Sequence, residues 1–216
     1  RPYKIPMRAG AILLALIALF ATSYTVIGAA EVGHLKRVYL GGSMPPGQII
    51  ATNRENGPQA EILPPGFHFR LALNLLYDVE RLPITEIAEN HYGLLVARDG
   101  APLKPGQFLA SGCPEAQLAQ MLDAKFFLEN GGQKRPQLNV LRPGKYRLNR
   151  YLFDIKTEQA TNIEAGLVGV IKSNVQEVDD CQPLEHSYDG ALSVPLVPRG
   201  CIGVWNTPLL PGRYYL

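Results

Sequence analysis

The chain has 216 residues, of which 46% are hydrophobic and 19% charged, with 21 Gly, 18 Pro and a formal net charge of +2. Gly and Pro are scattered along the whole chain, which argues against an all-helical bundle because Pro breaks helices and Gly weakens them. The lack of a three-residue period excludes collagen, and the apolar fraction excludes low-complexity disorder. The length suits one large domain or two to three small units with a buried core.

The positive charge is concentrated at the N-terminus. Arg1, Lys4 and Arg8 precede every acidic residue, whereas residues 31–216 hold 18 Lys and Arg against 19 Asp and Glu, a net charge of −1. The basic character therefore comes from the flank 1–8, and a nucleic-acid-binding surface is not expected.

Residues 9–30 form a run of 22 residues without a charge. As a helix at about 1.5 Å per residue they reach about 33 Å, enough for a hydrocarbon core of about 30 Å. We therefore predict a transmembrane helix over 9–30. Two alternatives stay open: a buried core helix, and a cleaved signal peptide, for which Ala29 and Ala30 before Glu31 supply small residues.

The charges that flank this run predict its orientation. Cations favour the cytoplasmic side of a membrane, so the flank 1–8 is expected in the cytoplasm and residues 31–216 beyond the membrane. Lys36 and Arg37 follow the run and weaken the asymmetry. The predicted location is the bacterial inner membrane, crossed once, with the rest of the chain periplasmic.

The cysteines Cys113, Cys181 and Cys201 contain no Cys-x-x-Cys pair. Zinc-site and thioredoxin-type interpretations therefore have no support. Two arrangements stay open: one disulfide with one free thiol, or three buried thiols.

Residues 31–216 contain segments of similar sequence in the same order, which indicates a repeat architecture. Segments 46–51 and 105–110 share Pro-Gly-Gln and a closing Ala, and 58–66 and 136–144 both begin Pro-Gln and end Pro-Gly. Four residues recur at an offset of 76, namely Asp78/Asp154, Thr85/Thr161, Ile87/Ile163 and Gly93/Gly169. A third, shortened copy closes the chain at 209–216. The three copies share a Leu three residues before a Gly and an aromatic ring two after it: Leu63 and His68, Leu141 and Tyr146, Leu209 and Tyr214.

Each copy has features typical of β structure. Segments 93–96, 166–171 and 202–205 are short, rich in β-branched or aromatic residues and bounded by turn residues, which predicts strands. Pro-Gly suits the central positions of a type II turn. We predict a mainly β fold with minor α, built from tandem small barrel-like or sandwich-like units at 31–83, 84–160 and 161–216, the last expected to continue beyond the chain.

The second copy carries 19 extra residues between Ala110 and Pro136. Pro114 fits a first helical position, and Asn130-Gly131-Gly132 is a stop signal. Leu118, Met121, Leu122 and Phe126 share one face of the resulting helix. We predict a helix over 114–130 that packs either on a neighbouring unit or subunit, or on its own sheet.

Four segments carry a resemblance to a known family: 63–69, 163–171, 198–205 and 209–216. Their Gly-rich strand pair and Leu-x-Pro-Gly-x-His/Tyr turn resemble the opening of SPFH (band 7) domains, the family of stomatins, prohibitins and flotillins. The chain departs from that pattern because it carries the module nearly three times and shows no long charged coiled coil. The second departure is consistent with a chain that is the N-terminal part of a longer protein.

The resemblance implies a membrane-anchored scaffold that forms homo-oligomeric rings or cages, organises a membrane microdomain and sequesters or regulates membrane proteins such as proteases. Its implied partners are lipids, copies of itself and a client protein, and it implies no catalytic residues, so an enzyme is not expected. One alternative is a periplasmic adaptor subunit of an export or efflux system, a class that normally inserts a long helical hairpin. Another is an anchored enzyme whose catalytic part lies beyond residue 216.

No established catalytic, cofactor or metal motif is present, so we predict no catalytic, cofactor-binding or metal-binding residues and no cofactor. The four His, at 34, 68, 91 and 186, are dispersed. His68 takes the aromatic position of the repeat, which indicates a packing role.

Two charge clusters remain. The basic one consists of Lys134, Arg135, Arg142, Lys145, Arg147 and Arg150. It suits lipid headgroups, an acidic subunit edge or a solvated loop. The acidic one consists of Glu177, Asp179, Asp180, Glu185 and Asp189, and it lacks the spacing of calcium loops. Together they suggest a head-to-tail contact between subunits that can close into a ring.

Overall fold

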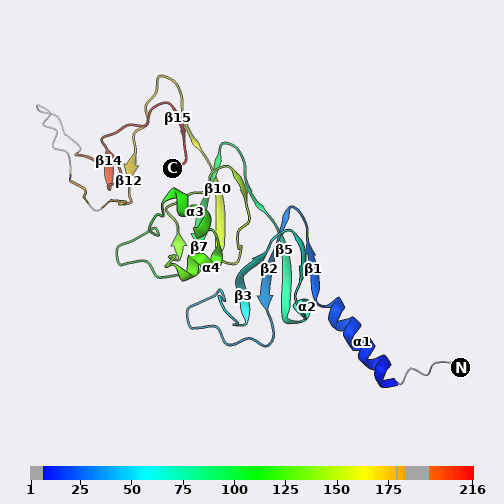
Figure 1. Ribbon diagram of the computed structural model, residues 1–216. Helices are drawn as coiled ribbons and strands as arrows, with labels where there is room; N and C mark the ends of the chain where they lie inside the picture. Colours follow the sequence, from blue (N-terminus) through cyan, green and yellow to red (C-terminus); the bar gives the residue numbers. More distant parts are fainter. Residues whose placement is uncertain (1–6, 179, 183–194) are drawn as a thin grey trace, which may run out of the picture.

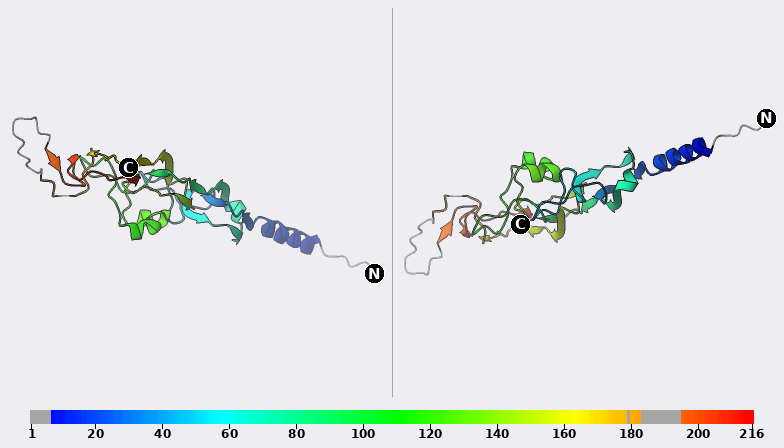
Figure 2. Two further views of the ribbon diagram at one scale, coloured as in Figure 1. Left: turned by 90° about the horizontal axis from the view of Figure 1, so that it is seen from above. Right: turned by 90° about the horizontal axis from the view of Figure 1, so that it is seen from below.

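The computed structural model describes residues 7–178, 180–182 and 195–216 (Figure 1). Strands outnumber helices, which confirms a mainly β fold with minor α. The elements lie in a row: helix α1 (Met7–Ala21) projects from one end, and three β units follow it (Figures 1 and 2). The C-terminal unit lies at the end opposite α1.

The first unit comprises two small sheets. Its elements are β1 (Tyr24–Ile27), β2 (Glu31–Arg37), β3 (Gly57–Leu63), β4 (Gly66–Phe69), α2 (Leu73–Leu76) and β5 (Tyr77–Pro83). The strand orders are β3-β2-β5 and β1-β4.

The second unit repeats this plan, whereas the third repeats it in part. The second contains β6 (Thr85–Ile87), β7 (His91–Ala97), α3 (Glu115–Met121), α4 (Ala124–Glu129), β8 (Arg135–Pro136), β9 (Gly144–Tyr146) and β10 (Phe153–Gln159). The third contains β11 (Thr161–Ile163), β12 (Lys172–Ser173), β13 (Leu196–Val197), β14 (Gly203–Trp205) and β15 (Gly212–Tyr214). The strand orders are β8-β7-β10 and β6-β9 in the second unit, and β12-β14-β13 and β11-β15 in the third. Every sheet of the described residues has two or three strands, so the barrel-like closure that we expected is absent from them.

The three units share one strand register. In each, an Ile of the opening strand pairs with the Gly of a Pro-Gly turn: Ile27 with Gly66, Ile87 with Gly144 and Ile163 with Gly212. In each, a Gly of the next strand pairs with the Leu of the repeat: Gly33 with Leu63, Gly93 with Leu141 and Gly169 with Leu209. The repeat found in the sequence is therefore also a repeat of backbone pairing.

In each unit, the Gly that pairs with the Leu of the repeat lies close to the side chain of the Ile in the opening strand. A Cβ built on Gly33, Gly93 or Gly169 lies 2.8, 3.1 or 2.5 Å from the Cδ1 atom of Ile27, Ile87 or Ile163, respectively. At Gly33 and Gly169 an added methyl group would overlap the Ile side chain unless that side chain moved, and at Gly93 the contact would be tight. Gly is thus what allows the Ile of the short sheet to cross over the strand of the longer sheet.

We predict that Gly169→Ala destabilises the third unit by about 1–3 kcal/mol through overpacking, and that Ile163→Val, which removes Cδ1, relieves part of this cost in the double variant. The check is a double-mutant cycle by urea denaturation. Ile163→Val alone is expected to destabilise by about 1 kcal/mol because it empties a methyl site. Purely additive losses would contradict the proposed contact.

The aromatic side chain of the repeat makes an equivalent hydrogen bond in each of the three copies. The ring of His68 bonds the carbonyl oxygen of Pro64 at 2.6 Å, and the hydroxyls of Tyr146 and Tyr214 donate to the carbonyls of Arg142 and Leu210, both at 2.8 Å. The structural role predicted for His68 therefore includes a polar contact that holds the turn.

The Pro-Gly turns are of two kinds. Gly47 and Gly106 both have φ of 82°, which fits a type II turn as predicted. Gly66, Gly144 and Gly212 have φ of 132°, 155° and 157° and begin strands β4, β9 and β15. The type II prediction is wrong for these three.

The prediction of one helix over 9–30 is wrong in its C-terminal part. Helix α1 ends at Ala21, and Tyr24–Ile27 forms β1, which pairs with β4. Thr25, Val26 and Ile27 are β-branched and fit a strand better than a helix. The Ser23 hydroxyl, which accepts from the Ala72 N–H at 2.9 Å, ties the turn between α1 and β1 to the first unit.

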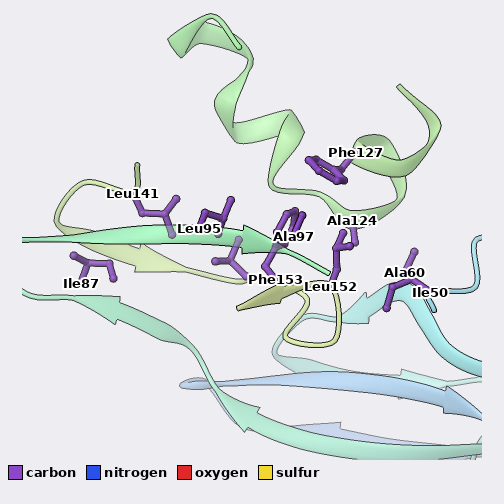
Figure 3. Close-up of a cluster of buried hydrophobic side chains, with 11 residues drawn as sticks. Ile50, Ala60, Ile87, Leu95, Ala97, Ala124, Phe127, Leu141, Leu152 and Phe153 are labelled. Atoms are coloured by element: carbon purple, nitrogen blue, oxygen red, sulfur yellow. The ribbon is translucent and has the colours of Figure 1, made fainter. Parts of the chain in front are cut away.

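The insertion in the second unit forms two short helices instead of one helix over 114–130. Asp123 caps the second of them, α4, by accepting from the Phe126 N–H at 2.8 Å. Phe127 packs edge-on against Phe153 of its own sheet at 5.2 Å between ring centroids. Ile50 and Ala60 of the first unit belong to the same buried cluster (Figure 3). Both packing alternatives are therefore realised within one chain.

Arg135 has a backbone conformation that glycine normally supplies. Its φ is 93°, and it pairs with Ala97 just as Gly57 pairs with Arg37 and Gly203 with Ser173. Both glycines also have positive φ, of 124° and 133°. The second unit thus places a side chain where the other two units have none.

We predict that Arg135→Gly stabilises the chain by about 1 kcal/mol, because it removes the cost of a left-handed non-glycine residue. Thermal and urea denaturation measure the change. Gly203→Ala is the matched control and is expected to destabilise. An Arg135→Gly variant less stable than the parent chain would show that the Arg side chain outweighs the backbone strain.

Candidate functional site

Helix α1 is apolar and exposed. Six large side chains are each more than half exposed: Ile12, Leu13, Leu14, Leu16, Ile17 and Phe20. Figures 1 and 2 show the helix pointing away from the described β units, and Phe20 at its C-terminal end reaches the first unit through Phe69. An apolar helix of this kind normally lies in a protein core or in lipid.

Aromatic side chains surround the junction between α1 and the first unit. Phe20 lies 6.1 Å from Tyr24 and 5.9 Å from Phe69, and Tyr24 stacks on Phe67 at 5.9 Å, all between ring centroids. All four rings are exposed, Phe67 by 64% and Phe69 by 55%. We call these four residues the aromatic collar.

Backbone contacts hold the collar in place. The N–H groups of Arg70 and Asn74 donate to the carbonyls of Ser23 and Thr22 at 2.9 and 2.8 Å. The Asn74 side chain donates to the Tyr24 carbonyl at 2.7 Å. The direction in which α1 leaves the first unit is therefore set by hydrogen bonds.

The first and second units meet at a buried polar joint. The Arg150 N–H donates to Nε2 of His34 at 2.9 Å, and Asn149 donates to the carbonyls of Gln59 and Ala60 at 2.8 and 3.0 Å. The Tyr151 hydroxyl donates to Glu80 at 2.7 Å, and burial together with this carboxylate raises the pKa of Tyr151. Segment 148–152 of the second unit thus fits into the first.

His34 is the titratable group at the centre of this joint. It is fully buried, and burial lowers its pKa, although hydrogen bonds to the carbonyls of Val32 and Leu148 oppose the shift. Because Nε2 accepts from Arg150, protonation at that nitrogen would break this hydrogen bond and leave the Leu148 carbonyl, at 3.2 Å, as its partner across the joint. Nearby Glu80 raises the pKa of His34, and Arg150 lowers it.

We predict that the joint loosens in mild acid. In the unfolded chain His34 takes up a proton near its ordinary pKa of about 6.5, whereas in the folded chain it does so only at lower pH. The folded state is therefore most favoured above about pH 6.5, and it loses this advantage as the pH falls from there towards the folded-state pKa. Thermal midpoints measured from about pH 7.5 to 5.5 should fall more for the parent chain than for His34→Gln. His91→Gln, outside the joint, should keep the parental slope, and equal slopes in all three chains would contradict the assignment.

One of the two cysteine arrangements left open is confirmed. Cys181 and Cys201 form a disulfide, with Cα atoms 5.5 Å apart, and Cys113 is a free thiol. Burial raises the pKa of Cys113, which disfavours the reactive thiolate. Disulfides persist mainly in oxidising compartments, so an extracellular or periplasmic environment fits this chain.

The basic cluster does not form one free patch. Arg142 pairs with Glu115 at 2.8 Å and Lys145 with Glu86 at 3.7 Å, and Arg150 lies in the joint. Of the acidic cluster, Glu177 and Asp180 are described, whereas Asp179, Glu185 and Asp189 lie outside the described residues. The head-to-tail contact suggested by these clusters stays a prediction.

The described part of the chain contains no grouping of three or more His, Cys, Asp or Glu side chains suited to a metal ion. His34, His68 and His91 each contact backbone carbonyls instead. His186 lies outside the described residues.

Comparison with protein-family models, with curated proteins and with solved structures gave no match. Of the helices within residues 7–178, 180–182 and 195–216, none has both the length and the apolar character needed to cross a membrane. Sequence reasoning missed the aromatic collar, although Phe20 and Tyr24 lie in the C-terminal half of the predicted anchor and Phe67 and Phe69 directly follow Pro65-Gly66. It also missed segment 148–152, which carries no motif.

Proposed function

We propose that the chain is a membrane-anchored scaffold of the SPFH type. In this proposal α1 enters the lipid bilayer, and the β units form homo-oligomeric rings or cages that organise a membrane microdomain. Such an assembly sequesters or regulates membrane proteins, for example proteases. The observation that carries the proposal is the exposed, apolar surface of α1.

The aromatic collar supports a lipid environment at the base of α1. Trp and Tyr are enriched where membrane proteins cross the lipid–water interface, because their rings are apolar and their edges polar. Tyr24 and Phe69 lie beside Phe20, the last large side chain of α1. Lipid contact by α1 places the collar at headgroup depth.

The proposed topology is single-pass in a bacterial inner membrane, with Arg1, Lys4 and Arg8 cytoplasmic and the β units periplasmic. The positive-inside rule favours this orientation. The Cys181–Cys201 disulfide agrees with it, because the periplasm is oxidising whereas the cytosol keeps thiols reduced.

The row of units supports assembly more than adaptor function. A periplasmic adaptor normally carries a long helical hairpin, whereas the helices inserted in the second unit have seven and six residues. The units instead lie one after another in an elongated row (Figure 2), which leaves their sides open to contact with neighbouring copies. An assembly of this kind has lipids and copies of itself as its main partners.

We predict that the chain floats with phosphatidylethanolamine–phosphatidylglycerol vesicles in a density gradient, and that Leu13→Lys with Leu16→Lys abolishes flotation. Each Lys at the centre of a membrane-inserted helix costs about 2.5–3.5 kcal/mol. Phe108→Lys, at a 79% exposed position of the second unit, is the control and should float like the parent chain. Equal flotation of both variants would contradict anchoring by α1.

The same vesicles test the scaffold part of the proposal separately. Electron microscopy and chemical cross-linking of the bound chain should show closed assemblies of many copies. Monomers on the vesicle surface would contradict the scaffold while leaving the anchor intact.

A further inference from the structure

A second apolar surface lies on the first unit, next to α1. Its side chains are large, apolar and between 44% and 82% exposed: Val38, Tyr39, Leu40, Leu71 and Leu75. We call these five residues the apolar rim. None of them belongs to the aromatic collar, and none is part of the buried clusters found in the described residues. The rim is therefore a surface that the fold of the chain leaves uncovered.

Backbone hydrogen bonds bring the rim to the end of the first unit from which α1 leaves. The N–H of Val38 donates to the carbonyl of Leu76 at 2.9 Å, so the loop after β2 lies beside the end of α2. The N–H groups of Arg70 and Asn74 hold the segment around α2 to the turn after α1. Figure 1 shows α2 next to the C-terminal end of α1. The rim and the collar thus share one end of the first unit.

The rim and the collar also form one continuous surface. A hollow of about 610 Å³ lies between them. Four of its lining residues belong to the collar or the rim, namely Tyr24, Val38, Tyr39 and Leu75. Asp78 and Arg81 also line it and contribute one charge of each sign. Whatever covers the collar can therefore extend over the rim without crossing a strongly charged region.

Leu40 is held outward in an unfavourable conformation. It is the most exposed of the large apolar side chains described, and its φ is 59°. This left-handed conformation suits Gly, Asn or Asp far better than Leu. The Arg37 guanidinium supports the loop by donating to the carbonyls of Tyr39 and Leu40 at 3.2 and 3.1 Å. A leucine presented in this way is accounted for by an apolar surface outside the chain.

Charged residues are absent from the segments that form the rim. Residues 38–53 and 71–77 contain no Lys, Arg, Asp or Glu. Next to the rim, Arg70 is paired with Glu61 at 2.8 Å, and Arg37 is bound to the loop carbonyls. A surface of this composition suits the boundary between headgroups and acyl chains, where apolar side chains of non-spanning segments insert.

We propose that the apolar rim inserts into the interfacial layer of the bilayer that α1 enters, so that the first unit rests on the membrane. This inference rests on the proposed function, because α1 brings the rim to the bilayer. It adds a second lipid contact that anchoring by α1 does not require. Two contacts from one unit fix the angle at which the row of units stands on the membrane.

The test places tryptophan probes in the 216-residue chain bound to phosphatidylethanolamine–phosphatidylglycerol vesicles. These vesicles contain brominated phosphatidylcholine, which quenches tryptophan that touches lipid. Tyr39→Trp and Leu71→Trp report on the rim, and Leu16→Trp reports on α1. Phe108→Trp, at a 79% exposed position of the second unit, is the matched control. Trp205 of the third unit is present in every chain, and the parent chain measures its background.

Both rim probes should lose emission in the brominated vesicles, and the control should not. Bromine near the headgroups should quench the rim probes more than bromine near the bilayer centre, and the order should be reversed for Leu16→Trp. Quenching of Leu16→Trp alone overturns the inference and leaves the anchor intact. Quenching of none of the probes overturns both the inference and the proposed function. Equal quenching of the rim probes and the control overturns the inference, because the contact is then not specific to the rim.

A charge substitution tests the rim while α1 stays unchanged. In the Tyr39→Trp chain, Leu40→Asp should abolish quenching of the probe, because a carboxylate resists transfer out of water. Leu40→Met is the apolar control and should keep the quenching. Both chains should still float with the vesicles. Quenching that survives Leu40→Asp overturns the inference, as does a blue shift of the probe without quenching, because protein such as a second copy then covers the rim.

Discussion

The fold depends on one contact made three times: an isoleucine from a short strand lies directly over a glycine in the next strand. A side chain at Gly33 or Gly169 would overlap the isoleucine methyl group, and one at Gly93 would be in tight contact with it. Because the contact locks the two small sheets of a unit together, neither sheet needs to be large. This explains how sheets of two or three strands form a stable unit, since isolated pairs of strands are marginal in water.

The contact within units is matched by a polar joint between them. Asn149, Arg150 and Tyr151 each make a hydrogen bond to the first unit, and Leu148 and Leu152 are buried beside them. The inserted helices add apolar packing from the other side through Ala124 and Phe127 (Figure 3).

Much of the fold could be predicted because the repeat is marked by Gly and Pro, whose backbone conformations are distinctive. Gly93 and Gly169, with the Leu-Pro-Gly turns, predicted the second and third copies. The first copy begins with the same pattern, Thr25, Ile27 and Gly33, at the same spacing as Thr85, Ile87 and Gly93. The helix predicted over 9–30 included Thr25 and Ile27 because it was based on the length of the uncharged run. Hydropathy does not distinguish β-branched residues in a strand from those in a membrane-spanning helix. The joint formed by segment 148–152 could not be predicted, since it depends on tertiary hydrogen bonds of residues that carry no motif.

Single residues join the units: Ile84 lies between β5 and β6, and Ala160 between β10 and β11. Both donate to the equivalent carbonyl, of Ala30 at 3.0 Å and of Asn90 at 2.7 Å. A duplicated gene segment running from one of these residues to the next encodes a whole unit together with a working junction. A single duplication or deletion of such a segment would therefore add or remove one unit. Each such event would lengthen or shorten the row by the length of one unit.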